Sequence, residues 1–252
     1  MVSALPLSMT TLPPSCRRFV ELAVAIFTVG SASAQTTVSV PGTANIYGAG
    51  FATAPAPNGS GGGVLPTSFS LPTGTSALTI TGVTGSVTFA VGTVTPNAAD
   101  GGTSFSALTQ LSAYNSLSGI TYNGRTTFLA GVFLDASTPT GTEPATLIYN
   151  DTSAGASSFS PLLRQVFFVG DGLDSSAATQ LFNVPSGATR FFMGFADSWN
   201  GSSITGVPGN YSDNSGSLSV TINAIPEPAT VSLLGGLVAL GAFCLKRKPR
   251  DA

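Results

Sequence analysis

The sequence of 252 residues contains no histidine, and only 8% of its residues are charged. The absence of imidazole excludes a serine–histidine or cysteine–histidine catalytic pair and a histidine-ligated zinc ion. The two cysteines, Cys16 and Cys244, lie beside or within apolar stretches near the chain ends. The central part of the chain therefore has neither a disulfide framework nor a Cys-x-x-Cys site.

Basic residues are scarce between the two chain ends, where only Arg125, Arg164 and Arg190 occur. The same part of the chain has no lysine, and residues 35–224 carry eight acidic side chains. Binding of DNA or RNA depends on a basic surface. An acidic region without lysine therefore disfavours a nucleic-acid partner.

The segment 1–34 has the order of parts that is typical of a secretory signal peptide. A basic pair, Arg17 and Arg18, precedes the apolar stretch 19–30, and a small-residue cleavage site ends at Ala34. The pattern predicts that the rest of the chain is exported. An uncleaved anchor or an ordinary buried helix is the alternative.

The C-terminal segment 225–252 combines a Pro-Glu-Pro motif, an uncharged apolar run and a basic end. The length of the run at 229–245 is close to the lower limit for a helix that spans a bilayer. The basic residues after it should stay cytoplasmic. The pattern predicts a single C-terminal transmembrane helix that holds the preceding domain outside, and a core helix with a solvated basic face is the alternative.

The order of these parts, with Pro226, Glu227 and Pro228 as the motif, resembles the PEP-CTERM sorting signal of Gram-negative bacteria. The resemblance implies that an exosortase cleaves near the motif and releases or transfers the protein. The membrane anchor would then be transient. The expected final location is the cell surface or the extracellular space.

Residues 35–224 contain short β-branched and aromatic runs separated by glycine, proline and asparagine turns, and a helical period is hard to find. Alternating apolar and polar residues, as in 217–222, are typical of strands with one buried face. We therefore expect an all-β ectodomain with a β-sandwich or jelly-roll fold. The predicted strands are 36–40, 77–82, 86–95, 126–134, 145–150, 164–170, 179–184, 189–196 and 217–222.

The densest polar cluster lies between the last two predicted strands and contains Asp197, Asn210, Asp213 and Asn214. Oxygen side chains gathered on a loop are the ligands that calcium prefers. The alternative is turn chemistry, because asparagine, aspartate and glycine form turns without binding anything.

The segment 209–220, Gly-Asn-Tyr-Ser-Asp-Asn-Ser-Gly-Ser-Leu-Ser-Val, is similar to the signature of the PA-IL-type, galactose-binding lectins. The resemblance implies that Asp197, Asp213 and Asn214 hold a calcium ion, which in turn binds sugar hydroxyls. Asn210 falls where the family has a threonine that contributes to the metal site. The loop after Asp197 is longer here than in that family.

Asp100 and Trp199 are two further candidates for ligand binding. Asp100 falls near the expected position of a second binding loop of the lectin family. Trp199, the only tryptophan, would either support a sugar ring or cover the end of the sandwich. A second acidic turn contains Asp171 and Asp174, and it is either a solvated loop or a weak cation site.

The sequence favours a non-enzymatic, exported envelope or matrix protein with calcium-dependent binding of a carbohydrate polymer. A structural surface or biofilm component without a small ligand is the alternative. The scattered acidic residues permit a glycosidase with paired carboxylates but do not indicate one. Ice binding would need a regular Thr-x-Thr array, and the occurrences at 79–81 and 93–95 do not form such a repeat.

Overall fold

The computed structural model describes residues 34–57, 61–89, 95–198 and 204–227. Strands dominate these residues, so the all-β class predicted from the sequence is confirmed. The predicted signal peptide, except Ala34, and the predicted transmembrane helix at 229–245 lie outside the described residues. Among the residues described, no helix has both the length and the apolar character that crossing a bilayer requires.

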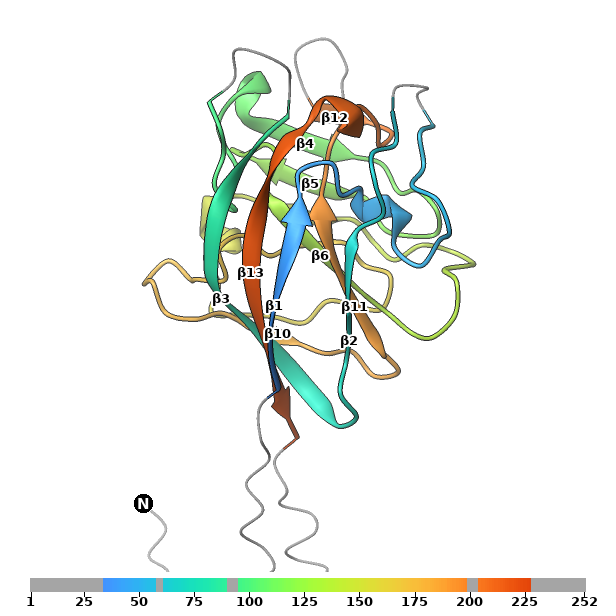
Figure 1. Cartoon of the computed structure of the whole chain (residues 1–252), viewed down its shortest axis with the longest axis vertical. Helices are drawn as coiled ribbons and strands as arrows, with labels where there is room; N and C mark the ends of the chain where they lie inside the picture. Colours follow the sequence, from blue (N-terminus) through green and yellow to red (C-terminus); the bar gives the residue numbers. More distant parts are fainter. Residues whose placement is uncertain (1–33, 58–60, 90–94, 199–203, 228–252) are drawn as a thin grey trace, which may run out of the picture. The chain divides into compact units, whose positions relative to one another are not determined.

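Three sheets make up the described part of the chain (Figure 1). Their strand orders are β1-β13-β3-β10-β8, β2-β11-β6-β9 and β12-β4-β5-β7. The strands are β1 Ala34–Pro41, β2 Thr67–Ser70, β3 Thr75–Thr88, β4 Leu108–Leu111, β5 Ile120–Asn123, β6 Leu129–Leu134, β7 Leu147–Tyr149, β8 Ser158–Phe159, β9 Phe167–Phe168, β10 Leu181–Asn183, β11 Arg190–Phe195, β12 Ile204–Gly206 and β13 Ser215–Pro226. The short helices are η2 Ile46–Gly48, η3 Phe105–Ala107, α2 Asp151–Ala154 and η4 Tyr211–Asp213.

The first sheet is built around β13, which lies between β1 and β3 (Figure 1). β13 pairs antiparallel with β1, where Ala224 faces Ala34, and with β3, where Pro226 faces Thr75. Its alternating burial, with Val220 and Ile222 fully buried, matches the alternation seen in the sequence. Hydrophobic residues on every second position therefore fix the register of this strand.

One hydrophobic core joins the three sheets through aromatic side chains. Phe167 of β9 stacks on Phe133 of β6, with ring centroids 5.4 Å apart, and lies 5.7 Å from Phe182 of β10 in the first sheet. Tyr149 of β7, in the third sheet, lies 6.0 Å from the ring of Phe168 of β9. The fold is thus sandwich-like, but it has three hydrogen-bonded sheets where the sequence predicted the two of a simple sandwich.

Every predicted strand contains at least part of an observed one, with some differences in extent. The strands predicted over 77–82 and from 86 onward are one continuous strand, β3. Gly82 and Gly85 interrupt the run of β-branched residues in the sequence, which suggested two strands. In the structure both glycines have positive φ and lie within β3, which pairs with β13. The strands that were not predicted are β2, β4, β5, β8 and β12.

Candidate functional site

The polar loop between β11 and β13 gathers three of the predicted metal ligands. Asp197 follows β11, and Asp213 and Asn214 lie at the end of η4 and just before β13. The charge of Asp213 and the side-chain amide of Asn214 both influence the pKa of Asp197, so these groups lie near its carboxyl. The structure therefore brings these three side chains together, and their role as metal ligands stays a prediction.

Hydrogen bonds to buried groups hold this loop in place. The hydroxyl of Tyr211, which is fully buried, accepts from the amide of Asp197 and donates to the carbonyl of Phe195, each at 3.0 Å. The side-chain nitrogen of Asn214 donates to the carbonyl of Gly42 at 3.0 Å. The loop is thus fastened to β11 and to the turn that follows β1.

Two oxygen atoms in this loop are buried without a partner. Asp197 is 2% exposed and Asn214 is 6% exposed. Oδ1 of Asp197 accepts from the amide of Ser198 at 2.7 Å. In contrast, Oδ2 of Asp197 and Oδ1 of Asn214 accept no hydrogen bond from the described residues. Buried polar atoms are normally paired, so these two oxygens indicate a missing proton or cation.

Burial also changes the acid–base behaviour of Asp197. Removal of the carboxyl from water raises its pKa to about 8, and the charge of Asp213 adds to this effect. The Asn214 side chain and the Ser198 amide act in the opposite direction. The carboxyl is therefore largely protonated at neutral pH unless a cation replaces the proton.

The remaining predicted site residues lie elsewhere or outside the described part. Asn210 precedes η4 with a left-handed φ of 62°, and its carbonyl accepts from the amide of Asp213 at 3.4 Å. Trp199 lies outside the described residues. Asp100 lines a different cleft, described below. Across the residues that the structure describes, no three acidic, histidine or cysteine side chains are grouped as metal ligands, so a cation here would also need amide or carbonyl oxygens.

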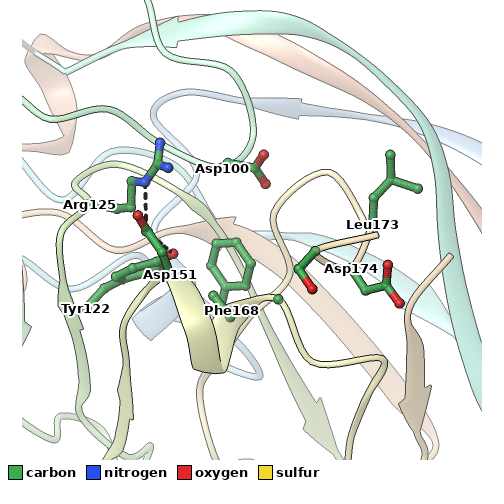
Figure 2. Close-up of a pocket in the computed structure, with 10 residues that line it drawn as sticks. Asp100, Tyr122, Arg125, Asp151, Phe168, Leu173 and Asp174 are labelled. Carbon is green, nitrogen blue, oxygen red and sulfur yellow. Dashed lines mark hydrogen bonds and ion pairs between the residues drawn. The ribbon is translucent and has the colours of Figure 1, made fainter. Parts of the chain in front are cut away.

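A cleft of about 220 Å³ brings together polar residues that the sequence did not group (Figure 2). Asp151 Oδ1 accepts from Nε of Arg125 at 3.1 Å and from the hydroxyl of Tyr122 at 3.0 Å. These two contacts lower the pKa of Asp151, whereas burial raises the pKa of Asp100 in the same cleft. No motif connects these residues, so sequence spacing offered no signal for this site.

Comparison with protein families finds one match, the PEP-CTERM protein-sorting motif, at residues 224–248. The motif indicates exosortase-dependent sorting to the cell envelope. Pro226 ends β13, Glu227 is exposed, and Pro228 lies outside the described residues. Comparisons with curated proteins and with solved structures gave no match, so the similarity to PA-IL-type lectins remains a prediction.

Proposed function

We propose that this chain is an exported, non-enzymatic envelope protein whose β domain binds calcium through Asp197, Asp213 and Asn214. The observation that supports this is the burial of Oδ2 of Asp197 and Oδ1 of Asn214, neither of which has a hydrogen-bond donor among the residues that the structure describes. Calcium binds carboxylate, amide and carbonyl oxygens in one site, so a bound ion would provide a partner for Oδ2 of Asp197 and Oδ1 of Asn214. Asn210, beside η4, is the fourth proposed ligand.

The second part of the proposal is that the bound ion contacts a carbohydrate of the envelope or matrix. Asp213 is exposed, whereas Asp197 and Asn214 are buried, so a sugar would approach from the side of Asp213. Trp199 is the proposed platform for the sugar ring. Before processing by the exosortase, the C-terminal segment would anchor the protein in the membrane, and the processed protein would remain at the surface or outside the cell.

A thermal melt of the purified full-length protein tests calcium binding. A ligand that binds only the folded state stabilises it, by about 2.7 kcal/mol at a concentration of 100 Kd. We expect calcium to raise the melting midpoint and EDTA to reverse the change. Asp213→Ala should abolish the shift, while Glu143→Ala, which removes an exposed acid outside the loop, should retain it.

A structural surface component without a small ligand is the second candidate. The hydrogen bonds from Asp197 and Asn214 to Tyr211 and Gly42 hold the loop without an ion, which favours this alternative. A wild-type midpoint that does not respond to calcium would exclude the calcium mechanism and support the structural role.

A further inference from the structure

We infer that the cleft lined by Asp100, Arg125 and Asp151 is a carbohydrate-binding site that takes one uncharged sugar ring of a polysaccharide without calcium. This inference goes beyond the proposed calcium site, with which the cleft shares no lining residue. It depends on four features of the cleft, namely its fixed rim, its paired donor and acceptor, its apolar wall and its net charge.

The rim of the cleft is formed by segments that lie far apart in the sequence and are fastened to one another. Oδ1 of Asp100 accepts from the backbone amide of Asp171 at 2.9 Å. Oδ1 of Asp174 accepts from the amides of Ser176 and Ala178 at 2.8 and 2.9 Å. Because these bonds already hold the rim, a ligand would not have to order it, and this favours affinity.

A donor and an acceptor lie side by side on one wall of the cleft. Figure 2 shows Arg125 and Asp151 next to each other, with Tyr122 below them. Both hydrogen bonds within this group end on Oδ1 of Asp151, and Arg125 contributes only its Nε. Among the described residues, no hydrogen bond is found for Oδ2 of Asp151 or the terminal nitrogens of Arg125, so these atoms can contact a ligand. Neighbouring sugar hydroxyls, each both donor and acceptor, match this pair.

The pair is accessible and faces an apolar surface. The side chains of Arg125 and Asp151 are 34% and 66% exposed. Figure 2 places Phe168 between this pair and Leu173, which is 39% exposed. Phe168 lines the cleft but is only 4% exposed, so the C–H face of a sugar ring would pack mainly on Leu173. The volume of about 220 Å³ is below the roughly 300–1,000 Å³ of clefts for drug-sized ligands, so it suits a single ring.

The charge of the cleft selects among sugars. Within the described part of the chain, Arg125 is the only cation that lines it, against the three carboxylates of Asp100, Asp151 and Asp174, and it is already paired with one of them. Uronic acids and phosphorylated sugars would therefore be repelled. The carboxylates do not form a metal site either, since in the described ranges no such trio is arranged around a common point. An uncharged sugar ring fits both constraints.

Affinity electrophoresis of the full-length protein in EDTA tests this site, with dextran, galactomannan, hydroxyethyl cellulose or alginate in the gel. We expect at least one of the three neutral polymers to retard the protein and the anionic alginate to have no effect. Asp151→Asn and Arg125→Gln should each raise the Kd for the retarding polymer at least tenfold. Glu143→Gln removes an exposed charge outside the cleft and should leave the Kd unchanged. Thermal midpoints of the variants confirm that they fold.

Three results would overturn the inference. These are no retardation by any neutral polymer, equal retardation of wild type and cleft variants, or retardation that requires calcium. The last result would place the sugar at the calcium site and so support the proposed function instead. Conversely, loss of the calcium-dependent melting shift in Asp213→Ala with unchanged retardation would leave the cleft site intact.

Discussion

At the scale of single residues, Asp197 is the position where folding and the proposed calcium binding are most directly connected. Its carboxyl is buried, and its Oδ2 accepts no hydrogen bond from the described residues. In the folded protein, burial raises the pKa of this carboxyl from its ordinary value of 3.8 to about 8. The folded state therefore keeps a proton that the unfolded state releases above pH 4, and this difference makes stability depend on pH.

We predict that, in EDTA, this group lowers the stability of the protein as the pH rises from 4 to 8. Stability is lost because the folded state must either keep the proton or bury a charge. The loss reaches about 5 kcal/mol, since each pKa unit of difference between the two states corresponds to about 1.4 kcal/mol. Thermal melts at several pH values measure it. Asp197→Asn, which cannot ionise, serves as the control, and an identical pH dependence in the variant and the wild type would contradict the prediction.

At the scale of elements, β13 connects the folded domain to the sorting motif. The strand is paired with β1 up to Ala224 and with β3 up to Pro226. A protease binds its substrate as an extended segment with free backbone groups. β13 offers none up to Ala224, where it is paired on both sides, and Ile225 and Pro226 are still paired with β3 on one side. The first proline of the motif is therefore part of the fold and not part of an accessible linker.

We predict that the processed protein keeps every residue through Pro226, because scission before that point would require β13 to leave the sheet. Mass spectrometry of the C-terminal peptide from the native host measures this. Val220→Asp places a charge at a fully buried position of β13 and should allow cleavage further upstream. A wild-type C-terminus before Pro226 would show that the strand does not protect this segment.

The strands differ in how well the sequence alone predicts them. β1, β11 and β13 were predictable because runs of β-branched or aromatic residues mark them at 36–40, 189–196 and 217–222. β4, β5 and β12 have three or four residues and are partly polar, so their pairing with neighbours decides their structure. Asp197, Asp213 and Asn214 were predictable as a group because one loop holds them. The cleft residues come from separate segments, and only the fold brings them together.

At the scale of the whole molecule, the aromatic core makes the three sheets one cooperative unit. Phe167 contacts Phe133, Phe182 and Phe191 at centroid distances of 5.4, 5.7 and 6.1 Å, and these rings come from the first and second sheets. Removal of such a ring leaves a cavity that both sheets line. The third sheet depends on the same core, because Tyr149 packs on Phe168, the neighbour of Phe167.

We predict that Phe167→Ala lowers the free energy of unfolding by about 3–5 kcal/mol, the usual cost of deleting a fully buried phenylalanine. Urea unfolding followed by far-UV and near-UV circular dichroism should show both signals shifting together, since sheet pairing and aromatic packing are lost in one transition. Leu162→Ala is the matched control, because this side chain is 59% exposed and should change stability by less than about 0.5 kcal/mol. Two separate transitions would show that the sheets unfold independently. A loss below about 1 kcal/mol would show that Phe167 does not hold the sheets together.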